Sequence, residues 1–281
     1  MANLSGKFAL VTGAGRGIGA ATAEKLTAAG ARVLVNDLDP HVAAEVASRL
    51  DGAVAYPADL TEAAAADELV EFALSAFGSL DIVVNNAGYI WHSAIHNMTD
   101  EQWDAMLDIH ASAQFRILRA YGRWLRGVAD QTSPVRKVVN ISSTMGLHGG
   151  ATQLAYSAGK AAVVGLTKTL AKEWGRFNVT VNAVAFGAID TRLTSPYENE
   201  PNISMVKGQP RKVGQRRADK TGRGGFAARQ NWQRRGRSQR DLFDVHTRIQ
   251  LDHRRSAARQ RRRSQLATAF LARQLARKPA N

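Results

Sequence analysis

The sequence contains no cysteine, which excludes disulfides and metal sites built on thiolates and permits a reducing compartment. It also lacks long apolar runs, and none approaches the roughly 20 residues that a membrane-spanning helix requires. The opening stretch MANLSGKFAL passes directly into a strand-like segment, without the basic and apolar regions of a secretory leader. These absences predict a cytoplasmic protein without a membrane partner.

Glutamate is absent from residue 201 onward, in a chain whose charge is unevenly distributed. Residues 1–200 contain 16 Lys and Arg against 20 Asp and Glu, whereas residues 201–281 contain 22 basic residues, 18 of them arginine, against 4 acidic ones. The net charge of +14 is therefore −4 in the first part and +18 in the second. A strongly basic chain suggests a nucleic-acid partner, but here only the tail is basic.

The first 200 residues alternate short β-branched runs with longer alanine-rich stretches. This alternation predicts an α/β fold, a Rossmann-like doubly wound parallel sheet with helices on both faces. The strand cores are apolar almost continuously, as strands buried on both faces should be. Strands are expected at Phe8–Thr12, Arg32–Asn36, Val54–Tyr56, Asp81–Asn85, Lys137–Ser142 and Thr180–Ala185. Helices are expected near 17–29, 40–50, 62–77 (capped by Thr61), 100–126 and 155–175.

The alternation stops after about Leu193. Segment 208–264 has neither a strand period nor a helix period, and only a candidate helix near 264–276 follows it. We therefore divide the chain into an α/β body, residues 1–200, and an arginine-rich tail, residues 207–281.

A glycine cluster follows the first expected strand and precedes a helix: Gly13-Ala-Gly15-Arg-Gly17-Ile-Gly19. Glycine lets the chain turn tightly, and it lets the start of the helix approach a pyrophosphate. The free N–H groups and the helix dipole then stabilise the charge of that pyrophosphate. A glycine cluster alone is weak evidence, but its position between strand and helix predicts a dinucleotide site.

Asp37 ends the second strand, where a carboxylate can accept hydrogen bonds from the adenosine ribose hydroxyls and repel a 2′-phosphate. This position favours NAD over NADP. Arg16 in the glycine loop can instead meet a 2′-phosphate, so NADP stays open as the alternative. Asp37 can also be a merely solvated carboxylate, since Asp39 lies next to it.

Three further motifs lie at later strand ends and at the start of the next helix: Asn85-Asn86-Ala87-Gly88, Ile141-Ser142-Ser143 and Tyr156-Ser-Ala-Gly-Lys160. Tyr156 and Lys160 share one helix face, so the ammonium can lower the phenol pKa and allow proton exchange near neutral pH. Ser143 lies 13 residues before Tyr156, and the intervening loop can return both side chains to one carbonyl group. Each motif alone can be structural, but together and in this order they indicate a catalytic site.

On these motifs, residues 1–195 resemble the short-chain dehydrogenase/reductase family, in particular its bacterial 3-oxoacyl-ACP reductases. The resemblance implies an oxidoreductase that transfers a hydride between NAD(P) and a small-molecule carbonyl compound or secondary alcohol, with a 3-oxoacyl thioester as a candidate. It implies Tyr156 as general acid/base and Ser143, rather than Ser142, as the residue that orients the substrate oxygen. Lys160 would bind the nicotinamide ribose and lower the tyrosine pKa.

The resemblance also implies the cofactor contacts. Gly13, Gly17 and Gly19 would lie at the pyrophosphate, Asp37 at the adenosine ribose, and Asp59 with Leu60 near adenine. Asn86 would lie beside the nicotinamide ribose and Ile189 near the carboxamide. The expected set is completed by Arg16, Ile18, Ala87, Gly88, Tyr156 and Lys160.

Two positions depart from the family pattern. His110 stands where the family has an asparagine that holds a water in a proton relay from the lysine to solvent. Histidine donates, accepts and titrates near neutrality, so it can serve in that relay, or it fills space in a less active enzyme. Phe186-Gly187 replaces a Pro-Gly pair, which we expect to reshape the cofactor edge without abolishing binding. No metal is expected, because His92 and His96 have no third ligand in the sequence nearby.

The tail departs most. After Thr191 the family has a substrate-covering loop, a helix and a seventh strand ending in Gly-Gly, whereas this tail reads QRRADKTGRGGFAARQNWQRRGRSQRD. Three interpretations of the tail are open. The first is a genuine arm that binds nucleic acid, which would favour a nucleotide-binding module without catalysis. The second is simple disorder, and the third is a shifted reading frame.

We favour the frameshift, starting near Lys207. With suitable synonymous codons, Arg235–Ser264 shifted by one base can read GEEASAIYLMCTPEFNWITGAALPVSGGG, which resembles the family ending. A chain without the seventh strand and the substrate lid should fold poorly and turn over little. Relatives form homo-oligomers through helices 100–126 and 155–175 and through the missing C-terminal elements, so the oligomeric state of this chain stays open.

Overall fold

The structure, a computed structural model, describes residues 3–187, 189, 191, 202–206 and 209–213. The proposed body-to-tail boundary, the possible frameshift and the candidate helix near 264–276 involve residues outside these ranges. No helix in the described part of the chain is long and apolar enough to cross a membrane.

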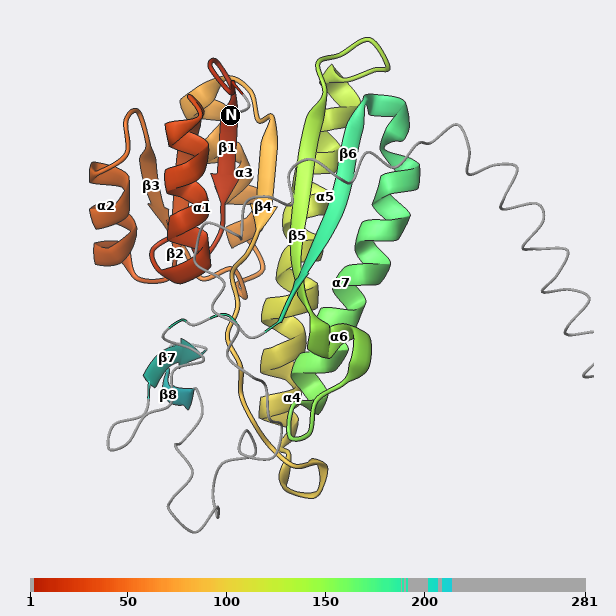
Figure 1. Cartoon of the computed structure of the whole chain (residues 1–281). Helices are drawn as coiled ribbons and strands as arrows, with labels where there is room; N and C mark the ends of the chain where they lie inside the picture. Colours follow the sequence, from red (N-terminus) through yellow and green to blue (C-terminus); the bar gives the residue numbers. More distant parts are fainter. Residues whose placement is uncertain (1–2, 188, 190, 192–201, 207–208, 214–281) are drawn as a thin grey trace, which may run out of the picture. The chain divides into compact units, whose positions relative to one another are not determined.

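Six parallel strands form one sheet in the order β3-β2-β1-β4-β5-β6 (Figure 1). The order reverses between β1 and β4, which creates the crevice in which doubly wound folds bind their ligands. The fold prediction is confirmed, and each expected strand end lies within one residue of the observed one. The strands are β1 (Phe8–Val11), β2 (Arg32–Asp37), β3 (Val54–Pro57), β4 (Ile82–Asn85), β5 (Arg136–Ser143) and β6 (Val179–Phe186).

Two hydrophobic cores cover the two faces of the sheet, because successive strand residues point to opposite faces. Ala9 and Val11 pack with helices α1 (Gly17–Ala28) and α2 (Pro40–Ser48). Leu10 belongs to the larger core on the other face. The helices that contribute to that core are α3 (Ala65–Phe77), α4 (Asp100–Leu107), α5 (Ala113–Val128) and α7 (Leu154–Glu173). Shorter helical segments are α6 (Thr144–His148) and the 3₁₀ turns Ile95–Asn97 and Gly175–Phe177.

The expected cap of the third helix is wrong. Thr61 does not cap it, because the Asp59 carboxylate accepts hydrogen bonds from both the N–H and the hydroxyl of Thr61, at 2.9 and 2.7 Å. The helix begins four residues later, at Ala65, with no side chain as its cap.

The single helix expected over 100–126 is interrupted. A π-helical turn, Asp108–Ser112, separates α4 from α5 and carries His110. Such turns add one residue to a helical turn, and they occur frequently at functional sites.

A further expected departure from the family, the loss of the seventh strand, concerns the sheet edge. In the described part of the chain, β6 pairs only with β5, so its outer edge has no strand neighbour. Strands β7 (Asn202–Val206) and β8 (Gln209–Val213) form a separate antiparallel pair, which the sequence pattern did not predict.

Candidate active site

The glycine loop lies at the carboxyl end of β1, at the point where the strand order reverses. Gly13 has a φ of +60°, and a Cβ on it would lie 2.8 Å from the Ala87 Cα, while a Cβ on Gly19 would collide with the Gly13 carbonyl oxygen. Asn86 fixes the loop from the neighbouring strand, because its Nδ2 donates to the carbonyl oxygens of Thr12 and Gly13 at 2.9 and 3.0 Å. Glycine is therefore required here by close packing.

The start of α1 suits an anion. No side chain caps this helix, and its first turn contains no acidic residue. The N–H groups at an uncapped helix start need an acceptor, and a pyrophosphate supplies one. The crowded, side-chain-free loop and the uncapped helix together fit a dinucleotide.

The carboxyl end of β2 holds two acidic side chains. Asp37 accepts a hydrogen bond from the Gly15 N–H at 2.9 Å, which ties the end of β2 to the glycine loop. Asp39 caps α2 by accepting from the N–H groups of His41 and Val42, and it forms an ion pair with Arg16 at 2.9 Å.

Three side chains from β5 and α7 lie close together near the carboxyl end of β5. Ser143 ends β5 and is buried, while Tyr156 and Lys160 lie in the first turns of α7. The Ser143 hydroxyl forms a side-chain hydrogen bond with Tyr156 and accepts the Met145 N–H at 3.1 Å. Ser142 is turned elsewhere, because its hydroxyl donates to the Lys160 carbonyl at 2.8 Å. The structure thus brings Ser143, and not Ser142, to the tyrosine.

Lys160 is the charged group of this cluster, and it is buried. Its Nζ donates to the Ile141 carbonyl at 2.8 Å and lies 5.8 Å from the centre of the Tyr156 ring. Burial lowers the pKa of Lys160 to about 7. Both its ammonium and its amine forms are therefore populated near neutral pH, which suits a group that passes protons.

The electrostatics of Tyr156 differ from the sequence expectation. Burial raises the pKa of Tyr156, and the hydrogen bond with Ser143 only partly opposes this shift. The expected lowering by Lys160 is not seen, because its ammonium is directed at the Ile141 carbonyl.

His110 lies against the tyrosine, with the two rings in edge-to-face contact at 5.0 Å between their centres. Burial lowers the pKa of His110 well below its usual value, and the Lys160 charge adds to this shift although the hydrogen bond to Tyr89 opposes it. The ring is therefore neutral. Its Nε2 lies 2.7 Å from the Tyr89 carbonyl oxygen, which can only accept, so Nε2 carries the hydrogen. The Nδ1 lone pair is buried and has no partner among the described residues.

Comparisons with known proteins place these motifs in a family. A family model described as short chain dehydrogenase matches residues 7–202. The chain belongs to the short-chain dehydrogenase family. The 3-oxoacyl-[acyl-carrier-protein] reductase of Synechocystis is 37% identical over 222 residues, covering 76% of this chain and 88% of that protein. The hydroxyacyl-CoA dehydrogenase ChsB1 of Mycobacterium tuberculosis is 40% identical over 220 residues, and the match covers 74% of this chain and 69% of that protein.

Solved structures agree. A short chain dehydrogenase from Mycobacterium avium matches with a TM-score of 0.62 at 35% identity, covering 67% of this chain and 71% of that one. The chain is accordingly an oxidoreductase of the NAD(P)-dependent short-chain dehydrogenase type, which transfers a hydride between the cofactor and a carbonyl compound or alcohol. The family relationship gives no support to a nucleotide-binding module without catalysis.

The remaining predicted cofactor residues of this short-chain dehydrogenase are less informative. The Asp59 carboxylate accepts a hydrogen bond from the Thr61 hydroxyl. Leu60 is buried in the larger core, and Ile189 is half-buried after the end of β6. Ile18 lies in the first turn of α1. His92 is hydrogen-bonded to the Thr152 hydroxyl, and the described residues bring no three potential metal ligands together.

Sequence reasoning missed two glycines in this short-chain dehydrogenase that accommodate His110. A Cβ on Gly88 would collide with the His110 ring, and a Cβ on Gly159 would lie 2.9 Å from the His110 Cβ. Gly88 was expected to contact the cofactor, and Gly159 was noted only as part of the Tyr-Lys motif. A bulky residue at position 110 is the feature that could have pointed to both.

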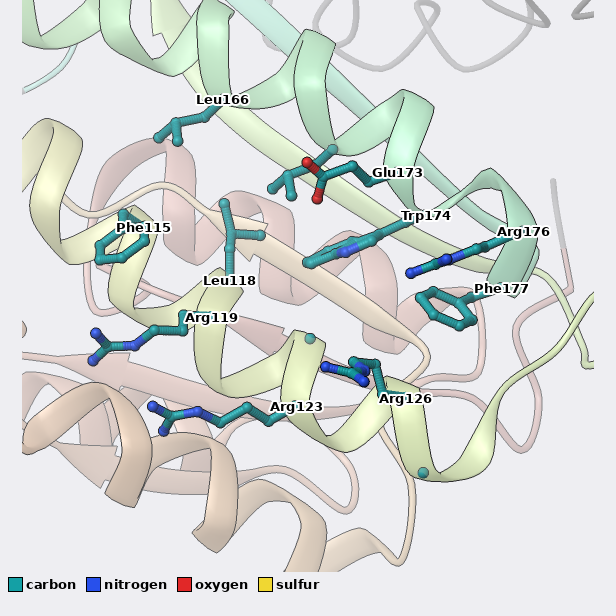
Figure 2. A pocket seen from close by; sticks show the side chains of 13 residues that line it. Phe115, Leu118, Arg119, Arg123, Arg126, Leu166, Glu173, Trp174, Arg176 and Phe177 are labelled. Atoms are coloured by element: carbon teal, nitrogen blue, oxygen red, sulfur yellow. The ribbon is translucent and has the colours of Figure 1, made fainter.

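A groove between α5 and α7 lies apart from the cluster of Ser143, Tyr156 and Lys160. Figure 2 shows Trp174 between the two helices, with Arg119, Arg123 and Arg126 along α5. Neither Ser143, Tyr156 nor Lys160 lines it. The groove is therefore not part of the candidate active site.

Proposed function

We propose that the chain reduces a ketone reversibly with NADH, and that its substrate is a 3-oxoacyl thioester. The observation that carries this proposal is the buried cluster of Ser143, Tyr156 and Lys160 next to a glycine loop suited to a dinucleotide. Two curated relatives, by their names, act on 3-oxoacyl and hydroxyacyl thioesters.

The chain's own residues handle the oxygen and its proton. Ser143 donates a hydrogen bond to the substrate oxygen and holds it next to the Tyr156 hydroxyl. Tyr156 gives its proton to that oxygen as the carbonyl carbon gains a hydride, which a bound NADH supplies. Lys160, with a pKa of about 7, then returns a proton toward the phenolate. In the oxidation direction each proton moves the opposite way.

Asp37 supports the preference for NAD. Its carboxylate is hydrogen-bonded to the glycine loop, at the expected ribose end of the cofactor site. There it can accept hydrogen bonds from the ribose hydroxyls, and it would repel a 2′-phosphate. Arg16, the group that would favour NADP, is paired with Asp39.

The test is the reduction of acetoacetyl-CoA, followed by the loss of NADH absorbance, with NADPH and a simple cyclic ketone as matched comparisons. We expect NADH to bind at least about 10-fold more tightly than NADPH, since a phosphate beside a carboxylate costs on the order of 1 kcal/mol or more. We also expect the thioester to be reduced faster than the cyclic ketone. Tighter binding of NADPH would refute the NAD assignment, and exclusive turnover of the cyclic ketone would refute the thioester assignment.

His110 is proposed as a positioning residue. Its unpartnered Nδ1 can accept a hydrogen bond from a water that also contacts Lys160, so the histidine would keep the route of proton return in place. His110→Asn, which keeps an acceptor, should retain most of the turnover, whereas His110→Phe should lose about 10-fold in kcat.

The pH profile separates this role from simple packing. In His110→Phe, the pH dependence of kcat should shift, because the surroundings of Lys160 change. In His110→Asn, the original pH dependence should be retained. Equal loss in both variants, with unchanged profiles, would make His110 a residue that only fills space.

A further inference from the structure

The two acidic side chains after β2 make different contacts. Asp37 uses one carboxylate oxygen for the Gly15 N–H and the other for the Asp39 N–H, at 2.9 and 3.2 Å. Asp39 divides its oxygens as well. Its Oδ1 accepts from the N–H groups that begin α2, and its Oδ2 binds the Arg16 guanidinium at 2.9 Å. The arginine of the glycine loop is thus held toward α2 by the second acidic residue.

The glycine loop and the start of α2 are in direct contact. A Cβ placed on Gly15 would lie 2.7 Å from Val42 Cγ1 and 2.8 Å from Asp37 Oδ2. A cofactor group bound to the Asp37 carboxylate would therefore lie in the same small region as the Arg16–Asp39 pair. The opposite charges of Arg16 and Asp39 therefore act on the group at short range.

The charges in this region decide between a hydroxyl and a phosphate. Asp37, Asp39 and Arg16 together give a net charge of −1, and the guanidinium that would normally attract a phosphate is already paired. The side chains of Arg16 and Asp39 are 49% and 37% exposed, so the arginine has room to reorient once the Asp39 carboxylate is removed. Its orientation depends on the charge of Asp39.

We propose that Asp39 is a specificity-determining residue, which excludes NADP by holding Arg16 away from the 2′-position of the adenosine ribose. This inference rests on the proposed NAD-dependent function. It assigns the discrimination to Asp39 and Arg16 in addition to Asp37. On this proposal, Arg16 would bind the 2′-phosphate if the Asp39 carboxylate were removed.

Asp39→Ser and Asp39→Asn test the proposal in the full-length chain. Serine and asparagine both cap helices, so α2 keeps its cap while the carboxylate charge is lost. Dissociation constants for NAD⁺ and NADP⁺ are measured by titration calorimetry, without turnover. We expect each variant to bind NADP⁺ about 10-fold more tightly than the wild type, because the freed arginine gains a charge-assisted hydrogen bond. The NAD⁺ affinity should stay within about threefold.

Arg16→Ala supplies the control. Combined with Asp39→Ser it should remove the gain in NADP⁺ affinity, and alone it should change the ratio of the two affinities by less than about twofold. The same variants should show the same order with adenosine 2′,5′-bisphosphate against AMP, which probe only this end of the site.

Two results would overturn the proposal. The first is an unchanged ratio of NADP⁺ to NAD⁺ affinity in both Asp39 variants. The second is a selective loss of NADP⁺ affinity in Arg16→Ala alone, which would show that the arginine already reaches the phosphate. A wild-type chain that binds neither cofactor, nor AMP, would refute the proposed function and this inference with it.

Discussion

Tyr156→Phe is expected to lower kcat by about a thousandfold, with NADH affinity changed by no more than about threefold. The loss has this size because the variant removes the only hydroxyl proposed to exchange a proton with the substrate oxygen, and general acid–base groups contribute roughly 10²- to 10⁴-fold. Phenylalanine keeps the ring that packs edge-to-face on His110 at 5.0 Å, so the fold of α7 should persist. Steady-state kinetics and calorimetric NADH binding measure the two effects separately.

The paired serines supply a matched control for this experiment. Ser143→Ala removes the hydroxyl that meets Tyr156 and should lower kcat by about 100-fold. Ser142→Ala removes a hydroxyl that donates to the Lys160 carbonyl, so it should act mainly on thermal stability. If Ser142→Ala lost more turnover than Ser143→Ala, or if Tyr156→Phe remained active, the proposed roles would be wrong.

The parts of the molecule that followed from the sequence depend on local patterns. The strand limits were predicted to within one residue because buried parallel strands are almost continuous apolar runs, and β1, Phe8–Val11, is one example. The proximity of Tyr156 and Lys160 was predicted from a short motif, since their spacing places them on one helix face. Patterns of this kind can be recognised without knowledge of what packs around them.

The parts that did not follow depend on contacts between distant residues. Lys160 was expected to lower the pKa of Tyr156, but its Nζ binds the Ile141 carbonyl, 19 residues away in the sequence. Thr61 was expected to cap a helix, but Asp59 competes for its donors. The pairing of Arg16 with Asp39, across 23 residues, could not be read from either motif. Each case is a competition between partners that only the folded chain brings together.

The π-helical turn at His110 is a further feature that the sequence did not predict. The sequence pattern over 100–126 is amphipathic throughout, so it indicated one continuous helix. The turn Asp108–Ser112 places the buried His110 ring against Tyr156, where Gly88 and Gly159 leave room for it. The histidine was found from the sequence, but its neutral state and its free Nδ1 required the contacts with Tyr89 and Lys160.

A one-base correction of the gene near codon 207 is expected to have the second large effect. The corrected protein should melt more than about 10 °C higher than the present chain, because a core helix and strand supply several kcal/mol. Its turnover should rise by about 100-fold or more, because a substrate lid positions the reacting groups and excludes water. Resequencing the gene from codon 195 past the stop comes first, followed by thermal unfolding and kinetics on both proteins.

The structural reason lies at the edge of the sheet. Within the described residues β6 pairs with β5 alone, and the family model ends at residue 202, just before the proposed shift. An unpaired strand edge invites association with other chains, so the present protein should also aggregate more readily than the corrected one. If the gene sequence stands, no corrected frame exists, and the chain is monodisperse and fully active, the arginine-rich tail is genuine. A salt-dependent affinity for DNA that is lost on truncation after residue 206 would then be the result to look for.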